Sequence, residues 1–193
     1  MADLEPRFAE LTLQQQAAYY YSRKRRRARI AAAAGGGAPA SFEPLYTNTN
    51  GQGDRTATIT ITESFTWSNG SIGSNLVDGA SANNATDSVV FPAMTVIGEW
   101  FKFDFATAHH ISEFTWTQNN ADAMGTWKMQ GSNNDTDWTD LSTAEIIGGA
   151  TSVVTTLDLI GASDSYRYYR MLGTAGTSNA TAWMQEIEFK IDA

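Results

Sequence analysis

The sequence has no cysteine, which excludes disulfide bonds and any metal site built from thiolates. Its apolar runs stay well short of the roughly 20 residues that a membrane-spanning helix requires, so no membrane contact is predicted. Proline occurs only four times among the 193 residues, and histidine only twice. A chain of this length can form one well-buried domain with an appendage, but it is short for two ordinary domains.

Residue patterns for the common kinds of catalysis are also missing. His109 and His110 are adjacent, and successive side chains of an extended chain point apart, so a shared metal site is not expected. There is no Gly-x-Ser-x-Gly nucleophile elbow, and the glycines at 35–37 lack the Lys-Ser/Thr pair of a phosphate-binding loop. Asp135 and Asp137 fall in a predicted turn, where solvation explains them. The sequence therefore predicts a protein that is not an enzyme, with no catalytic residue.

The chain is instead rich in residues that favour strands. Hydrophobic residues make up 42% and aromatic residues 11% of it, with aromatics and threonine prominent. Short segments of alternating apolar and polar residues are separated by polar, glycine-rich turns. The clearest segments are 56–62, 100–105, 112–116, 152–160, 166–171 and 184–191. About eight short strands with turns between them predict an all-β sandwich.

The alternation predicts which side chains face the core of this sandwich. The inward set comprises Ala57, Ile59, Ile61, Phe101, Phe103, Phe105, Phe114, Trp116, Ile187, Phe189 and Ile191. The outward set on the last segment is Glu186, Glu188 and Lys190.

Charge divides the chain into two regions. Residues 1–44 carry a net charge of +3, whereas residues 45–193 carry −11, which suggests surfaces with different partners. Between them, residues 31–40 read AAAAGGGAPA, a stretch of small residues that cannot build a core. We therefore predict a basic N-terminal arm over 1–44, with a hinge at 31–40, followed by a domain over 45–193.

The arm contains a cluster of basic residues and a short helical pattern. The cluster is Arg23, Lys24, Arg25, Arg26, Arg27 and Arg29, and Phe8 and Leu11 lie at helical spacing from Leu4. Four interpretations compete: a secretory signal, contact with nucleic-acid phosphates, an anchor on a larger assembly, and a solvated tail. The signal would need a stronger apolar stretch than 30–34. The helix is too weakly amphipathic to fold alone. Because an arm of this composition would rarely be ordered unless it packs on a partner, the anchoring interpretation is preferred, and nucleic acid is a less favoured partner.

Several ordered motifs resemble the discoidin or coagulation-factor type C domain, a galactose-binding-like jelly roll also used as a carbohydrate-binding module. The matching motifs are Leu76-Val77-Asp78-Gly79, the strand 100–105, the hairpin 129–138, the Arg-Tyr-x-Arg-like strand 166–172 and the closing Gln185-Glu186-Ile187. Two motifs depart from the pattern: the hairpin has Asn134-Asp135 where Asp-Gly is usual, and Phe105-Ala106 replaces Leu-Gly.

The resemblance implies a jelly roll in which one structural Ca²⁺ often lies between the Asp-Gly loop and the glutamate of the closing strand. The matching positions are Asp78 and Glu186, with Thr86 or Ser81 nearby. In the alternative interpretation Asp78 only accepts hydrogen bonds from backbone N–H groups of its own loop.

The resemblance also implies a ligand site in the loops at one end of the sandwich, where an aromatic side chain stacks on a sugar. The candidates are Trp67, Asn69, Asn119, Asn120, Ser178 and Trp183. Trp116, Trp127 and Trp138 lie in strand contexts and are predicted to be core residues. For Arg167 and Arg170 a structural ion pair is favoured over ligand contact.

Two functions follow as expectations. The residues that make up its motifs are most similar to those in copies of this domain in virion proteins of tailed bacteriophages. The preferred hypothesis is therefore a structural virion protein, whose arm binds other virion proteins while the jelly roll serves as decoration or as an adhesin for host glycans. The alternative is a free-standing, lectin-like carbohydrate-binding module.

Overall fold

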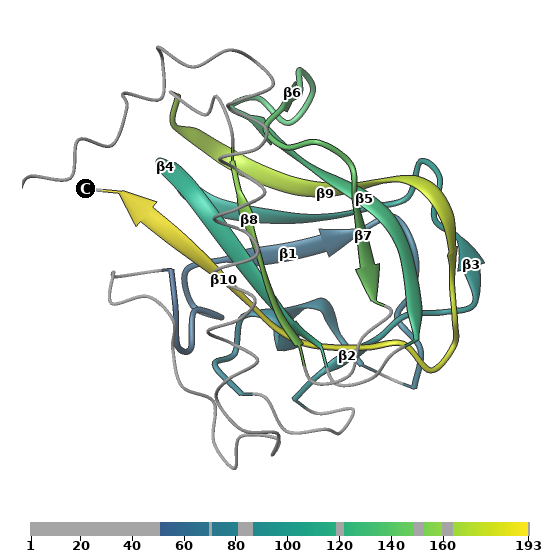
Figure 1. The fold of residues 1–193 in the computed structure, drawn as a ribbon. Helices are drawn as coiled ribbons and strands as arrows, with labels where there is room; N and C mark the ends of the chain where they lie inside the picture. The colour runs from purple at the N-terminus through teal and green to yellow at the C-terminus, as the bar shows by residue number, and fades with distance from the viewer. Residues whose placement is uncertain are drawn as a thin grey trace, which may run out of the picture. The chain divides into compact units, whose positions relative to one another are not determined.

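The computed structural model describes residues 51–69, 71–80, 87–118, 122–148, 153–159 and 164–192, and these form an all-β domain (Figure 1). Its only helical element in these ranges is the single 3-10 turn η2 (Gly73–Leu76). No helix among the described residues is long and apolar enough to cross a membrane. The predicted arm, including Phe8, Leu11 and the basic cluster, lies outside the described residues, as does the hinge.

Ten strands make up this part of the chain. They are β1 (Thr60–Glu63), β2 (Val89–Val90), β3 (Met94–Thr95), β4 (Trp100–Gln118), β5 (Ala123–Ser132), β6 (Thr139–Asp140), β7 (Glu145–Gly148), β8 (Val153–Asp158), β9 (Tyr166–Ser178) and β10 (Trp183–Asp192).

The strands form two antiparallel layers that share β4. The first half of β4 pairs with β1 and β9, and β9 continues the layer to β5, which in turn pairs with β6 and β7. The second half of β4 pairs with β8 and β10, and β10 pairs with β2 at its start. In Figure 1, β8 and β10 cross in front of β1. This arrangement confirms the predicted jelly-roll sandwich.

Strand β4 passes from one layer to the other at a corner near Ala106. The sequence predicted two separate strands here, whereas the structure has one long strand whose pairing register with β9 shifts between Asp104 and His109. Ala106 has a φ of 62°, a value that is uncommon for a residue other than glycine, and its N–H donates to Asp104 Oδ1 at 2.8 Å. The corner lets a single strand contribute to both layers.

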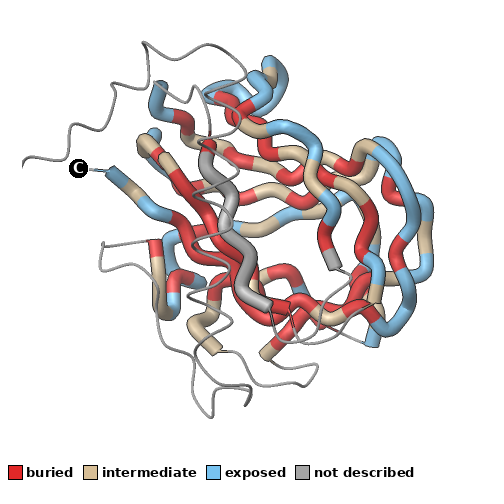
Figure 2. The backbone as a smooth tube through the Cα atoms, viewed as in Figure 1, coloured by how far each residue is buried: buried red, intermediate tan, exposed pale blue. Residues whose placement is uncertain are grey.

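The core lies between the two layers, and its aromatic residues come from both. Phe103 of β4 lies 5.0 Å from Phe189 of β10 between ring centroids, and Phe101 lies 5.3 Å from Trp127 of β5. All four side chains are buried, as are Phe105, Phe114, Trp116 and Ile187. The buried stretches of these strands are red in Figure 2. The predicted inward faces of 100–105 and 112–116 are therefore confirmed.

Two face assignments were wrong. Ala57 lies in an exposed turn, because β1 begins only at Thr60, so it is not a core residue. Glu186 and Glu188 were expected to face solvent, yet each is only 1% exposed. The segment 51–55 lies against β10, where the N–H of Phe189 donates to Gly51 O at 2.7 Å, and this contact covers a side of the strand that the sequence pattern left open.

The hairpin between β5 and β6 folds without the usual Asp-Gly pair. Asp135 takes the left-handed conformation, with a φ of 62°. Asn134 Oδ1 accepts hydrogen bonds from the N–H groups of Thr136 at 3.1 Å and Asp137 at 2.9 Å. Because asparagine and aspartate tolerate this conformation better than most residues, the substitution preserves the turn.

Candidate functional site

Trp183, the strongest predicted ligand contact, lies at the start of β10 at one end of the sandwich. It pairs with Val90 of β2, and Val90 also bridges to Ser68, which precedes the exposed Asn69. The next residue, Met184, pairs with Gln118 at the end of β4. The structure thus brings Asn69 and Trp183 to the same end of the sandwich.

Asn119 and Asn120 follow Gln118 directly but lie outside the described residues. Their predicted part in ligand binding stays a prediction.

Polar side chains meet at the turn that precedes Trp183 in the chain, and we call Asp122, Asn179 and Thr181 the loop cluster. Thr181 Oγ1 donates to Asp122 Oδ2 at 2.7 Å, and Asn179 Nδ2 lies 3.5 Å from Asp122 Oδ1. The N–H of Asn179 also donates to Ala123 O at 3.1 Å, which ties this turn to the start of β5. Neither Asp122 nor Thr181 was predicted as a site residue from the sequence. The available signal was their position in polar turns just before strands that contain predicted core residues.

Two of the predicted ligand contacts are in the core instead. Trp67 is only 4% exposed, and its ring lies 4.7 Å from that of Phe65 and 5.0 Å from that of Phe91. Ser178 is also 4% exposed, and its hydroxyl donates to Pro92 O at 2.7 Å. Both predictions were wrong, because neither side chain has a surface to present to a sugar.

The two predicted metal ligands do come together. The N–H of Gly79, next to Asp78, donates to Glu186 Oε2 at 3.1 Å. However, Arg55, which the sequence pattern did not mark as a site residue, binds the other oxygen of this carboxylate: its Nη2 donates to Glu186 Oε1. Arg55 also donates from Nη1 to Gly51 O at 2.6 Å and from Nε to Gly53 O at 2.8 Å.

Burial shapes the electrostatics of this group. Arg55 is 2% exposed, and burial lowers its pKa while the carboxylate of Glu186 acts to raise it. Burial likewise raises the pKa of Glu186 well above its usual range, against the opposing effect of Arg55. The pKa of Asp78 rises to about 6, chiefly because the carboxyl is partly buried. The buried guanidinium is the counter-charge for Glu186.

The described residues do not fit a calcium ion. Calcium requires six to eight oxygen ligands, but both oxygens of Glu186 and the carbonyls of Gly51 and Gly53 accept hydrogen bonds from N–H groups. Asp78 Oδ1 accepts from the N–H of Ala80 at 2.8 Å, as the loop-capping alternative predicted. Within the described ranges there is no group of three or more His, Asp or Glu residues that could hold a metal. Ser81 and Thr86 lie outside those ranges.

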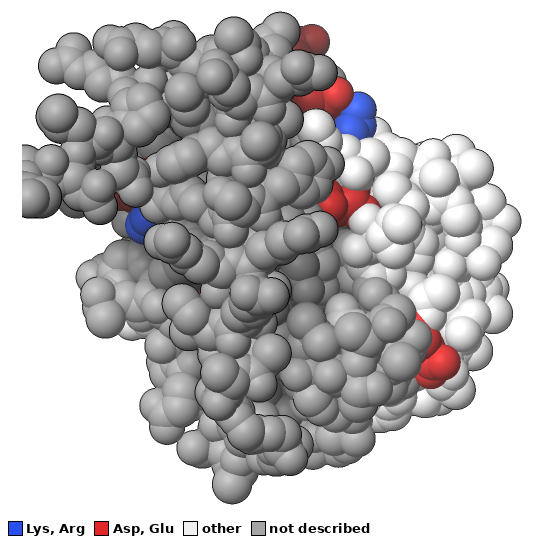
Figure 3. Space-filling view, viewed as in Figure 1, with Lys and Arg blue, Asp and Glu red and all other residues white. Residues whose placement is uncertain are grey.

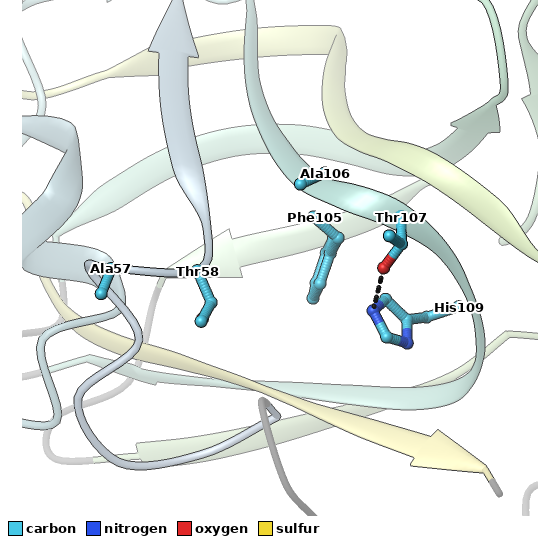
Figure 4. Close-up of a pocket in the computed structure, with 6 residues that line it drawn as sticks. All are labelled: Ala57, Thr58, Phe105, Ala106, Thr107 and His109. Atoms are coloured by element: carbon cyan, nitrogen blue, oxygen red, sulfur yellow. Dashed lines mark hydrogen bonds between the residues drawn. The ribbon is translucent and has the colours of Figure 1, made fainter.

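A cavity of about 290 Å³ lies at the β4 corner (Figure 4). It is lined by Ala57, Thr58, Phe105, Ala106, Thr107 and His109. The Nε2 atom of His109 is 3.1 Å from Thr107 Oγ1, whereas His110 Nδ1 is 3.1 Å from Asp192 Oδ2. The two histidines thus have different partners. None of the predicted ligand residues lines this cavity.

The outer face of the layer that contains β9 carries paired charges. Arg167 donates from Nε and Nη2 to the two oxygens of Asp104, both at 2.8 Å, which is the structural ion pair that the sequence favoured. Arg170 stacks 4.0 Å from the ring centre of Trp138. Trp138 is therefore half-buried on this face, in contrast to its predicted core position.

Trp116 and Trp127 are core residues, as predicted, with exposures of 1% and 0%.

On the face that Figure 3 shows, the described surface is mostly uncharged, with acidic groups scattered over it and Lys or Arg beside Asp or Glu near the top.

Comparison with known proteins gives matches in structure only. No protein-family model matches the sequence, and no curated protein matches it. Among solved structures, CBM32-1 of a family 31 glycoside hydrolase from Clostridium perfringens matches with a TM-score of 0.53 and 13% identity, over 68% of this chain and 92% of its own.

Two further structures match in the same way. The family 32 CBM of C. perfringens NanJ, in complex with galactose, has a TM-score of 0.52 and 11% identity over 69% of this chain and 94% of its own. A fucolectin from striped bass (Morone saxatilis) serum has a TM-score of 0.53 and 14% identity over 69% of this chain and 47% of its own. At these identities the likeness establishes the fold. The described residues of this chain have the discoidin-like, galactose-binding-like jelly-roll fold that the order of the sequence motifs predicted.

Proposed function

We propose that this chain is a carbohydrate-binding module whose glycan site lies at the end of the sandwich that contains Trp183. The observation that carries the proposal is that Trp183 begins β10 directly after the turn that holds Asn179 and Thr181 of the loop cluster. An aromatic ring next to hydrogen-bonding groups on loops is the combination that sugar recognition needs. The galactose bound in the NanJ structure and the name of the striped-bass lectin support the ligand class.

The chemistry of these groups suits a sugar. One face of a pyranose ring carries C–H groups that pack against an indole, and its hydroxyls donate and accept hydrogen bonds. Asp122 accepts hydrogen bonds only, whereas Asn179 and Thr181 can both donate and accept. Because Thr181 already orients the Asp122 carboxylate, less freedom is lost when a ligand binds.

We further propose that the module does not catalyse a reaction. His109 and His110 have separate partners, and Asp122 contacts a threonine and an asparagine, an arrangement that suits binding. The three structures named above are a CBM32 module of a glycoside hydrolase, a family 32 CBM from NanJ and a fucolectin. The assignment as a non-enzyme thus rests on analogy of fold.

A glycan array with the full chain tests the proposal, with Trp183→Ala beside the wild type. We expect the wild type to bind a defined set of sugars and Trp183→Ala to lose them. Trp138→Ala is the matched control, because Trp138 is also half-buried but stacks on Arg170, away from the loop cluster. Wild-type protein that binds no glycan, or a Trp183→Ala variant that keeps the wild-type pattern, would refute the assignment.

A second candidate function rests on the charge of the sequence. The +3 region before residue 45 and the −11 domain after it support a module that a basic arm fastens to a larger assembly, such as a bacteriophage virion. Deletion of residues 1–40 should then leave a folded domain that no longer incorporates into particles. Incorporation of the truncated protein would eliminate this candidate, and filter binding at low salt would show whether the arm binds nucleic acid instead.

A further inference from the structure

Three segments that are distant in sequence meet at Arg55. The N–H of Arg55 donates to Val77 O at 2.8 Å, just before the Asp78-Gly79 loop. A Cβ built on Gly79 would lie 2.7 Å from the backbone N of Asp54, so this loop packs directly on the segment 51–55. The side chain of Arg55 then extends to Glu186 of β10.

The guanidinium engages the atoms that a structural cation would use. Its N–H groups donate to the carbonyl oxygens of Gly51 and Gly53 and to the carboxylate of Glu186. Carbonyl and carboxylate oxygens are the ligands that calcium prefers in proteins. Arginine differs from calcium in that it is part of the chain, stays protonated and presents its donors in a fixed plane.

The acidic groups around Arg55 favour a positive charge at this position. Glu186, Glu188, Asp78 and Asp54 all lie close enough to interact electrostatically with the guanidinium, and the first two are buried. A divalent ion bound at Glu186 would displace Arg55 from this carboxylate and leave a second cation beside it. The site is therefore built for one internal cation.

We propose that Arg55 is the structural cation of this module, and that its guanidinium takes the place of the calcium ion that the resemblance implies. The segment 51–55 and the Asp78-Gly79 loop are then fastened to β10 without a divalent metal. This inference does not depend on glycan binding.

The first test uses the wild-type full chain and needs no variant. Thermal unfolding is measured after treatment with EDTA and again in millimolar CaCl₂, with calcium titration calorimetry alongside. The expected result is the same melting temperature in both solutions and no stoichiometric heat of binding. A melting temperature that rises with calcium and falls with EDTA, together with stoichiometric binding, would overturn the proposal.

Variants test whether Arg55 holds the segment 51–55 and the Asp78-Gly79 loop to β10. Arg55→Met should lower the melting temperature by on the order of 10 °C, because it leaves the Glu186 carboxylate buried without its counter-charge. The matched control is Arg167→Met, which breaks an ion pair at the surface and should change the melting temperature little.

A double variant distinguishes the effect of the Arg55–Glu186 charge pair from the effect of side-chain packing. Arg55→Met with Glu186→Leu should recover most of the lost melting temperature, since both charges are removed together. If the losses of the two single variants simply add, the residues do not act as a pair and the proposal fails.

Discussion

The carbonyl oxygen of Val96 lies so close to Gly173 that a Cβ on that glycine would come within 1.9 Å of it. The turn at 96–99 lies directly on β9, where the N–H of Gly98 donates to Gly173 O at 3.0 Å and the N–H of Gly173 donates to Glu99 O at 2.8 Å. Only a residue without a side chain allows this approach.

Gly173→Ala should therefore destabilise the fold severely, by about 3 kcal/mol or more, because the backbone of the turn must move. Gly98→Ala is the matched control: Gly98 has a φ of 82° but nothing within 4 Å of a built Cβ. Only its backbone strain would contribute, at about 1 kcal/mol. Urea unfolding of both variants makes the comparison, and equal losses would show that the contact with Val96 is not tight.

At the corner in β4, replacing Ala106 with glycine should stabilise the fold. Ala106 has a φ of 62°, which glycine adopts without a steric penalty, so Ala106→Gly should raise the free energy of unfolding by about 0.5–1 kcal/mol. Ala108→Gly is the control two residues later, at an exposed strand position without a positive φ, and it should lower stability slightly. Loss of stability in both variants would contradict the left-handed conformation of Ala106.

Because of Tyr169, the protein should lose stability at high pH. Its hydroxyl donates to His109 O at 2.6 Å, and burial raises its pKa from 10.0 to about 12. Since the unfolded chain ionises this group first, stability contributed by the neutral phenol is complete below pH 10.0 and is lost as pH rises towards about 12.

The matching measurement is the free energy of unfolding against pH for the wild type and Tyr169→Phe. The variant should be less stable at neutral pH by about 1 kcal/mol, through the lost hydrogen bond, and should show a shallower decline above pH 10.0. Parallel curves for the two proteins would mean that Tyr169 does not titrate late.

Much of the fold was predictable because its strands alternate in a simple way. Phe101, Phe103 and Phe105 gave a clear period of two, and the structure buries all three. The single long course of β4 was not predictable, since the change of layer depends on one strained residue, Ala106, and on a register shift with no pattern of its own.

The candidate site was less predictable, because it depends on contacts between distant segments. Trp67 and Trp183 have similar local sequence contexts, but three aromatic neighbours bury the first. Arg55 stood out by no local motif, and its partner Glu186 lies 131 positions away. Sequence alone could place the Asp-Gly loop near the closing glutamate, but not the cation between them.

Calorimetric titration of the array-selected sugar into wild type, Trp183→Ala, Asp122→Ala and the control Trp138→Ala is the decisive test of a glycan site at Trp183. A bound sugar that stacks on Trp183 predicts a loss of about 1–3 kcal/mol of binding free energy in the first two variants. Affinity should be near that of the wild type in Trp138→Ala. Wild-type affinity in both Trp183→Ala and Asp122→Ala would show that the sugar does not bind at Trp183.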